Sequence, residues 1–287
     1  MFMAVVKGRV MKKNPMVSAV IAAYKEEIHL AGCVDSLLNQ NYGNFEIIIV
    51  ENGESNDKTY QIALDYQRRY PEKVRAYSLS GKQKGPGNAW NFGAKKAKGE
   101  IVMTCGADLR YGRDYVKKAI VPIVKGESIG VVHKEETCNN INNLWARAFF
   151  YKRQSMHKNS LSRVFSLIRK DYLLKIPFNS ELGYADDQTI YRTNGGEFPC
   201  IDLEVYHTNP ASFKDNWEHS VWVGNSIRPW PIVFILPIFP LYSIYKTVKH
   251  LMIDFYVPFI FFLPFYYSIR YFAYLTSAFR KIISGKT

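Results

Sequence analysis

Short apolar runs alternate with amphipathic helical patterns over residues 1–224, and this rhythm constrains the fold more than any other feature of the chain. The runs from Val17 to Ala23 and from Phe45 to Glu51 are continuous enough to be strands buried on both faces. Strands of that kind, each followed by a helix, are typical of βαβ units. The alternation therefore predicts an α/β domain with a mainly parallel sheet flanked by helices.

The same rhythm continues along the domain. The further predicted helices and strands lie at residues 26–40 (helix), 58–70 (helix), 74–79 (strand), 88–97 (helix), 100–105 (strand) and 198–206 (strand). In an open parallel sheet, ligands bind beyond the carboxyl ends of the strands. The polar residues that follow each strand are therefore the candidates for a functional site.

Residues 225–287 form a second region of different composition. They hold 17 of the 43 aromatic residues, and seven basic residues accompany a single acid, Asp254. Two uncharged runs, Pro229 to Tyr245 and Phe255 to Ile269, are 17 and 15 residues long, at or below the roughly 17 to 25 residues that a spanning helix needs. With prolines breaking long helices, we expect short helices in or on one leaflet of a membrane. A spanning hairpin of two tilted helices, a helical subdomain packed on the sheet and a dimer interface are the alternatives.

The charge balance also favours a membrane. There are 38 Lys and Arg against 25 Asp and Glu, a net charge of +13, which calls for a polyanionic partner. Basic residues beside dense aromatic runs are typical of a membrane interface, whereas a nucleic-acid binder spreads its aromatic residues through a basic groove. Four cysteines scattered without a C-x-x-C pair indicate a reducing compartment. We therefore expect membrane association on the cytoplasmic face and no nucleic-acid partner.

Polar residues follow the first two predicted strands. Ala23, Tyr24 and Glu26 stand at the end of the first strand, and Glu51 and Asn52 stand at the end of the second. Neighbouring strand ends of this kind can read a base and a ribose through hydrogen bonds. Ordinary turn formation is the alternative for these segments.

A basic, glycine-rich loop opens the helix predicted at residues 88–97. In the segment from Lys82 to Gly93, backbone N–H groups around Gly87, together with Lys84 and Asn91, are suited to hold phosphate. The spacing matches neither G-x-x-x-x-G-K-[ST] nor G-x-G-x-x-G, which argues against a P-loop NTPase and a dinucleotide dehydrogenase. A plain loop with a capped helix is the alternative.

Further candidates lie beyond later strands. Asp108 follows the strand at residues 100–105 and is a natural ligand for Mg²⁺ or Mn²⁺, with Arg110 beside it. The carboxylates of Asp186 and Asp187 open a predicted helix, where they serve either as caps or as a general base. His207, at the end of the last predicted strand, can ligate metal or contact phosphate.

Taken in order, the motifs from about Met16 to Arg228 resemble those of the family 2 glycosyltransferases, which have the GT-A fold. The residues that carry the resemblance are Ala23 to Glu27, Glu51-Asn52-Gly53, the loop from Gly87 to Gly93 with Asn91, Gly106-Ala107-Asp108, Asp186-Asp187 and Tyr206-His207.

The resemblance implies a sugar transferase that uses a nucleotide-diphosphate sugar and inverts the anomeric centre. The acceptor would be a hydroxyl or phosphate group, lipid-linked or on a growing glycan. Asp108 would hold the diphosphate and a divalent metal, while Asp187, supported by Asp186, would deprotonate the acceptor. A hydrophobic C-terminal extension is familiar in members that act on membrane-bound acceptors.

The chain departs from the family pattern at two positions. Gly106 replaces the first Asp of the family's Asp-x-Asp, and Arg110 stands where some relatives have Gln. A metal would lose one carboxylate, while a guanidinium could itself neutralise diphosphate charge. The alternatives are a nucleotidyltransferase, disfavoured because it has no use for the late carboxylate pair, and a non-catalytic membrane scaffold. The nucleotide, sugar, acceptor and oligomeric state are left open.

Overall fold

The computed structural model describes residues 8–53, 55–80, 85–156, 166–180, 189–190, 198–226 and 238–285. The chain divides into two compact units, each built from two stretches. Unit 1 comprises Met1–Thr137 and Asn159–His207, and unit 2 comprises Cys138–Lys158 and Thr208–Thr287. The boundary predicted after residue 224 differs from this division, because unit 2 also includes residues 138–158 and 208–224.

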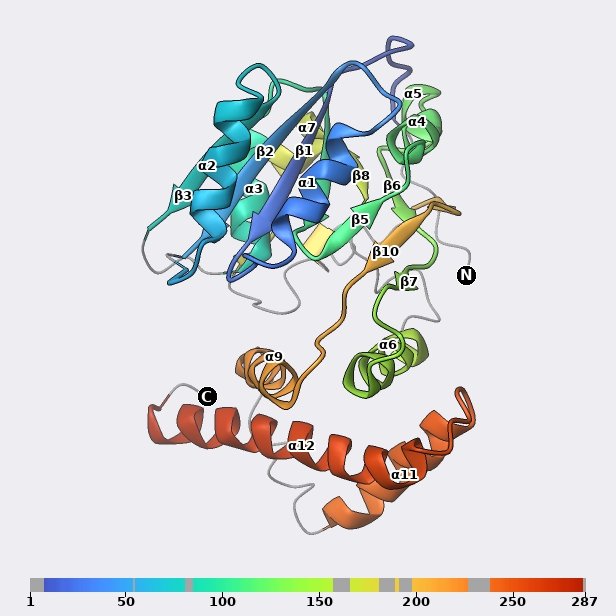
Figure 1. Ribbon diagram of the computed structural model, residues 1–287. Helices are drawn as coiled ribbons and strands as arrows, with labels where there is room; N and C mark the ends of the chain where they lie inside the picture. Colours follow the sequence, from blue (N-terminus) through green and yellow to red (C-terminus); the bar gives the residue numbers. More distant parts are fainter. Residues whose placement is uncertain are drawn as a thin grey trace. The chain divides into compact units, whose positions relative to one another are not determined.

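Unit 1 contains a seven-stranded sheet in the order β3-β2-β1-β4-β8-β6-β9 (Figure 1). Its strands are β1 (Val17–Ala23), β2 (Phe45–Asn52), β3 (Val74–Leu79), β4 (Ile101–Gly106), β6 (Gly130–His133), β8 (Leu167–Arg169) and β9 (Cys200–Ile201). The first four strands are parallel to one another, as predicted. β8 departs from the pattern, because it runs antiparallel to both of its neighbours, β4 and β6.

Helices cover both faces of this sheet (Figure 1). Along β1, Val17, Ala19 and Ile21 pack with the helices α1 (Leu30–Leu38) and α2 (Thr59–Arg69). Val20 packs on the opposite face with α3 (Pro86–Lys96) and α7 (Lys170–Lys175). This alternation is the period of two that a strand imposes. The unit also contains α4 (Tyr115–Ala119) and α5 (Val121–Val124).

Helix α3 lies unusually close to the sheet at Gly93. A Cβ atom on Gly93 would stand 2.1 Å from Val20 Cγ1, so any larger residue would force the helix and strand apart. This close contact fixes the N-terminal end of α3, which begins after Gly85 (φ 120°), at the edge of the sheet where β1 and β2 end.

A second, three-stranded sheet has the order β5-β10-β7. Its strands are β5 (Leu109–Tyr111), β7 (Thr137–Cys138) and β10 (Val205–His207). The strand predicted at residues 198–206 is therefore two short strands, β9 and β10, which belong to different sheets. Because β5 and β10 are antiparallel with Leu109 opposite His207, the end of β10 lies beside the start of β5.

Unit 2 is helical. Its elements are α6 (Leu144–Met156), α9 (Phe213–Asn225), α11 (Phe239–Leu251) and α12 (Phe259–Ile283). Ser277 of α12 donates a 2.9 Å hydrogen bond to the Val221 carbonyl of α9, and the Trp145 ring of α6 packs edge-on against Phe262. Arg147 of α6 makes two 2.7 Å hydrogen bonds to Asp254. Helices that precede residue 225 therefore pack with the C-terminal helices, which explains the observed division.

No helix in the described part of the chain is long and apolar enough to cross a membrane. The expectation that prolines break the C-terminal helices was wrong for α12, which runs for 25 residues with Pro264 inside it. Pro264 lies near the start of the helix, where the lost N–H removes a single hydrogen bond of the second turn. Its carbonyl accepts hydrogen bonds from Ser243 and Ser268.

Candidate functional site

The carboxyl ends of β1, β2 and β4 lie level with one another, because Ala23 pairs with Glu51 and Ala22 pairs with Gly106. The sequence predicted a site at this edge. Glu26 follows β1, and its backbone N–H donates a 2.8 Å hydrogen bond to Thr59 Oγ1. Burial, followed by repulsion from Asp108, raises the pKa of the Glu26 carboxyl to about 9, so it keeps its proton at neutral pH.

Asp108 and His207, which were predicted separately as candidate metal ligands, meet at this edge. Asp108 follows β4 and His207 ends β10, and the distance from His207 Nε2 to Asp108 Oδ2 is 2.8 Å. The pairing of β5 with β10 brings these two residues together across 99 positions of sequence. The His207 side chain is almost fully buried, whereas that of Asp108 is partly exposed. The pair therefore presents a carboxylate at the surface with an imidazole ring behind it.

A second carboxylate, which sequence reasoning missed, supports His207. Glu136 Oε2 lies 2.8 Å from His207 Nδ1, and Glu136 Oε1 lies 2.9 Å from His133 Nε2. The other nitrogen of His133 lies 3.0 Å from Ser166 Oγ and 3.2 Å from the Tyr115 hydroxyl. A signal was present in the sequence, although it was not used: His133 follows the short apolar run from Ile129 to Val132, and Glu136 follows three residues later.

The structure explains why residue 106 is a glycine. A Cβ atom at this position would lie 2.7 Å from Asp108 Oδ1, closer than real Cβ contacts come. The observed position of the Asp108 carboxylate therefore depends on the absence of a side chain at residue 106. The chain thus has one carboxylate in the Gly106-Ala107-Asp108 motif, and the imidazole of His207 lies 2.8 Å from it.

Arg110 lies on β5, with an exposed side chain that covers α1. A Cβ atom at Gly32 of α1 would stand 2.6 Å from both Nε and Nη2 of Arg110. Arg110 and Leu109 point to opposite faces of their strand, since successive side chains alternate. The guanidinium therefore lies on the α1 side of the sheet edge at which β1, β2 and β4 end.

Glu51 and Asn52 are both buried at the end of β2. The two carboxylate oxygens of Glu51 accept 2.6 Å hydrogen bonds from Ser78 Oγ and from the backbone N–H of Ser55, so Glu51 holds its own loop in place. The Asn52 amide donates to the Gly85 carbonyl. Asn52 Oδ1 has no hydrogen-bond partner among the described residues, which leaves a buried acceptor available at the predicted nucleotide edge.

The other predicted residues differ in their placement. Ala23 is in the core, Tyr24 is exposed beside it, and Gly87 is buried in the first turn of α3. Both ends of the Asn91 amide bond the backbone of Phe178, at 2.7 and 3.0 Å, so Asn91 fixes the segment after α7. The remaining three predicted residues lie outside the described residues: Lys84, Asp186 and Asp187.

The donor set at Asp108 and His207 fits a divalent cation. The donor atoms are 2.8 Å apart, close to the roughly 3 Å between neighbouring ligands of an ion bound at about 2.1 Å. The carboxylate oxygen suits Mg²⁺ or Mn²⁺, whereas an imidazole nitrogen is a ligand more typical of Zn²⁺, Fe²⁺ or Ni²⁺. Within the ranges that the structure describes, no group of three or more His, Cys, Asp or Glu side chains is placed to hold a metal. A cation here would therefore depend on further ligands from a bound anion and water.

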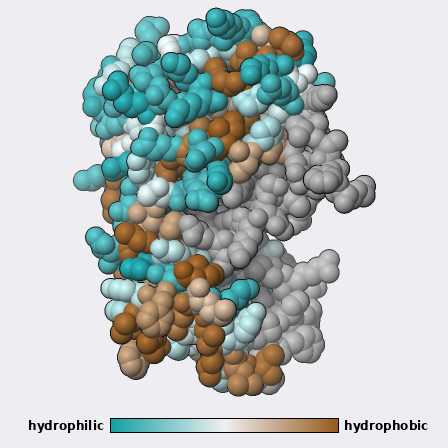
Figure 2. Space-filling model, turned by 90° about the vertical axis from the view of Figure 1, so that its right-hand side faces the viewer, coloured by the Kyte–Doolittle hydropathy of each residue, from teal (hydrophilic) through white to brown (hydrophobic). Residues whose placement is uncertain are grey.

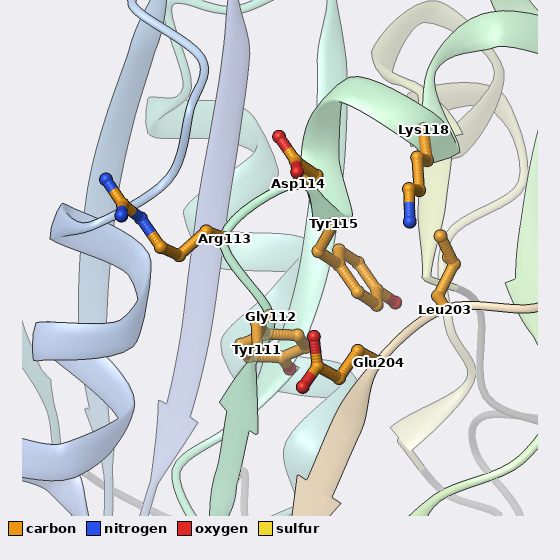
Figure 3. A pocket seen from close by; sticks show the side chains of 8 residues that line it. All are labelled: Tyr111, Gly112, Arg113, Asp114, Tyr115, Lys118, Leu203 and Glu204. Carbon is orange, nitrogen blue, oxygen red and sulfur yellow. The ribbon is translucent and has the colours of Figure 1, made fainter.

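A pocket of about 360 Å³ lies at the other end of the β5–β10 ribbon (Figure 3). Its walls come from the turn after β5, from α4 and from the segment before β10; they are Tyr111, Gly112, Arg113, Asp114, Tyr115, Lys118, Leu203 and Glu204. None of these residues was predicted as a site residue. The antiparallel pairing places this pocket one strand length away from Asp108 and His207.

A family model described as "Glycosyl transferase family 2" matches residues 18–183, which is more than half of the chain. The chain belongs to glycosyl transferase family 2. The resemblance inferred from the motifs is therefore confirmed, and the match includes the strand ends at Glu26, Asn52 and Asp108.

Relatives within the family match parts of the chain. A chondroitin synthase of Escherichia coli is 26% identical over 211 residues, 70% of this chain and 30% of the relative. A dolichol-phosphate mannosyltransferase of Pyrococcus furiosus is 31% identical over 116 residues, 40% of this chain and 32% of the relative. The chain thus spans about a third of the length of these curated relatives.

Two solved structures share the family's α/β GT-A-like fold. A mannosyltransferase of Pyrobaculum calidifontis, solved with GDP-Man and Mn²⁺, aligns with a TM-score of 0.59 at 16% identity, covering 98% of this chain and 91% of its own. TarS of Staphylococcus aureus, solved with UDP, aligns with a TM-score of 0.52 at 22% identity, covering 73% and 64%. At these identities the likeness establishes the fold.

Proposed function

We propose that the chain transfers a sugar from a nucleotide-diphosphate sugar to a hydroxyl or phosphate acceptor, with inversion at the anomeric carbon. The observation that carries the proposal is the contact between Asp108 Oδ2 and His207 Nε2 at the edge where three parallel strands end. Membership of glycosyl transferase family 2 supports the reaction class. The acceptor is lipid-linked or a growing glycan. The name of one relative, a dolichol-phosphate mannosyltransferase, refers to a lipid phosphate, and that of another, a chondroitin synthase, refers to a glycan.

Asp108 and His207 would hold Mg²⁺ or Mn²⁺ against the donor diphosphate. When bound, the cation neutralises negative charge that develops on the leaving diphosphate. The Pyrobaculum mannosyltransferase was solved with Mn²⁺, which supports a divalent cofactor. Arg110 and Lys84 add positive charge on the protein side, since guanidinium and ammonium groups both bind phosphate oxygens.

The nucleoside would lie along the ends of β1 and β2. Asn52 Oδ1 is a buried acceptor whose missing partner a base N–H would supply. Tyr24 is exposed beside this edge, where its ring can pack against a base or ribose. Glu51 supports this edge indirectly, because its carboxylate fixes the loop that follows β2.

Asp187, with Asp186 beside it, would act as the general base. The Asp187 carboxylate takes the proton of the acceptor hydroxyl, the acceptor oxygen bonds to the anomeric carbon, and the bond from that carbon to the diphosphate breaks on the opposite side. The products are the glycosylated acceptor, the nucleoside diphosphate and one proton. Attack from the face opposite the leaving group inverts the anomeric configuration.

The test is a panel of UDP-, GDP- and dTDP-sugars, each with and without Mn²⁺. A donor should raise the melting temperature of the protein by mass action. We expect the stabilising donor to be hydrolysed or transferred with release of its nucleoside diphosphate. Release of sugar 1-phosphate would indicate a nucleotidyltransferase, because transfer of the nucleotidyl group from these donors breaks the bond between the two phosphates. Binding without any turnover would indicate a non-catalytic scaffold.

A further inference from the structure

Helix α11 has its polarity reversed relative to an ordinary surface helix. Its exposed face carries four apolar residues at helical spacing, with exposed fractions of 70, 56, 58 and 53%: Leu241, Ile244, Tyr245 and Val248. Its buried face carries polar residues instead, Ser243, Thr247 and His250. In water, a helix places its apolar stripe toward the core and its polar stripe outside. The exposed side of α11 is therefore built for an apolar neighbour.

Helix α12 carries a second exposed apolar stripe. The exposed residues are separated by four, seven, seven and four positions, which places them in one line along the helix at 3.6 residues per turn; they are Phe261, Phe265, Phe272, Phe279 and Ile283. The turn between α11 and α12 adds the exposed Met252, Phe255 and Val257. Figure 2 shows hydrophobic side chains gathered over this part of the chain. The apolar surface thus continues from one helix to the next.

The charges around these stripes have one sign. Lys249 and Arg280 are exposed, each at the flank of its apolar stripe. Asp254 is the only carboxylate side chain from residue 238 to residue 285, and it is buried in the ion pair with Arg147. The surface of α11 and α12 therefore shows cations and large apolar groups, without an exposed carboxylate side chain.

We propose that the exposed faces of α11 and α12 lie on the surface of a bilayer that contains anionic lipids. The exposed apolar residues of α11 and the line of phenylalanines on α12 can insert at the boundary between headgroups and acyl chains. The flanking cations can bind anionic headgroups. A basic, carboxylate-free rim complements anionic headgroups, which favours lipid over a second copy of this equally cationic chain. On this proposal α11 and α12 hold the chain at the cytoplasmic leaflet, the membrane surface on which a lipid-linked acceptor would also lie. The lipid contact itself does not rest on the transfer reaction, and its test measures binding alone.

The experiment is co-sedimentation of the full chain with vesicles. We expect binding to phosphatidylcholine vesicles that contain about 30% phosphatidylglycerol, and weaker binding to phosphatidylcholine alone or at high salt. The double variant Ile244→Glu/Phe261→Glu should lower the bound fraction about tenfold, because each change puts a charge into the apolar boundary. Lys249→Glu/Arg280→Glu should remove the preference for the anionic vesicles. The matched control is Leu174→Glu, which alters an exposed leucine on α7 of unit 1.

A second measurement does not depend on charged variants folding. In a Cys200→Ser background, which removes the exposed cysteine, a polarity-sensitive dye at Ile244→Cys should shift to the blue on adding anionic vesicles, whereas the same dye at Leu174→Cys should not. Equal shifts at both positions, or sedimentation of Ile244→Glu/Phe261→Glu like the unmodified chain, would overturn the proposal. So would a dimer that this double variant converts to monomers while neither form binds vesicles, since the face would then join two copies.

Discussion

The carboxylate of Glu136 holds the ring of His207 from behind: Glu136 Oε2 lies 2.8 Å from His207 Nδ1, on the side of the ring opposite Asp108. Groups that orient a metal-binding histidine in this way change metal affinity by about 10- to 100-fold when they are removed. We therefore expect Glu136→Gln to weaken Mn²⁺-dependent binding of the nucleoside diphosphate by that factor, as measured by calorimetry.

The control for this prediction is the neighbouring residue. Glu135 is exposed, and Glu135→Gln makes the same change of charge one position away. It should leave the affinity unchanged. If Glu136→Gln bound Mn²⁺ and nucleotide as tightly as the unmodified chain, His207 would not need Glu136 for its orientation.

The contact between Gly93 and Val20 gives a stability prediction. Gly93→Ala forces a methyl group against Val20 Cγ1, and overpacking of this kind typically costs about 1 to 3 kcal/mol. Val20→Ala should recover part of the loss in the double variant, because it removes the clashing atoms. Gly43→Ala is the control, since a Cβ there meets nothing within 4 Å. Denaturant unfolding measures the unmodified chain, the two single variants, the double variant and the control. Additive losses in the double variant would argue against the contact.

Asp187→Asn tests the base. Loss of a general base lowers turnover by roughly a hundredfold or more, while affinity for the nucleotide sugar should stay close to that of the unmodified chain. Steady-state transfer and donor titration separate the two effects. Asp202→Asn, at an exposed position, is the matched control. Near-normal turnover of Asp187→Asn would remove Asp187 from this role.

His250 gives a prediction for pH. Burial lowers its pKa from 6.5 to about 4, with a smaller opposing effect of Asp254. Between pH 6.5 and pH 4 the unfolded chain binds a proton that the folded chain does not. The contribution of His250 to the free energy of unfolding is therefore highest above pH 6.5 and decreases as the pH falls toward 4. From pH 7 to pH 4.5 the unmodified chain should lose about 2 kcal/mol more than His250→Gln. Parallel unfolding curves for the two proteins would show that His250 does not titrate in this way.

The strands of the parallel half were predictable from the sequence because each is a short apolar run with polar residues at its ends. β1 and β3 have the predicted bounds, and Asp108 and His207 meet as expected of strand-end residues. The predicted strand at residues 198–206 was wrong as a single element, because its two halves pair in different sheets. Such pairing depends on partners far along the chain, which a local pattern does not contain.

Long-range contacts also determine the partners of individual side chains, which the sequence did not reveal. Glu136 reaches His207 across 71 positions, and Asn91 reaches Phe178 across 87. A carboxylate or an amide beside a strand or at the start of a helix has the same local pattern whether it binds a ligand or another segment of the protein. Only the fold separates Asp108, whose side chain is partly exposed, from Asn91, whose amide is bonded to the backbone of Phe178.

β8 lies between β4 and β6 in the sheet, although it follows both of them in the chain. During synthesis, a chain emerging from the ribosome therefore carries two strands whose facing edges have no neighbour until residues 167–169 have been translated. Unpaired strand edges offer N–H and C=O groups to any other strand nearby. A nascent chain of this protein thus remains open to pairing with its neighbours on a polysome, or to capture by a chaperone, from the completion of β4 at residue 106 until β8 ends at residue 169. This gap in the sheet closes only after the first helix of unit 2 has already been made.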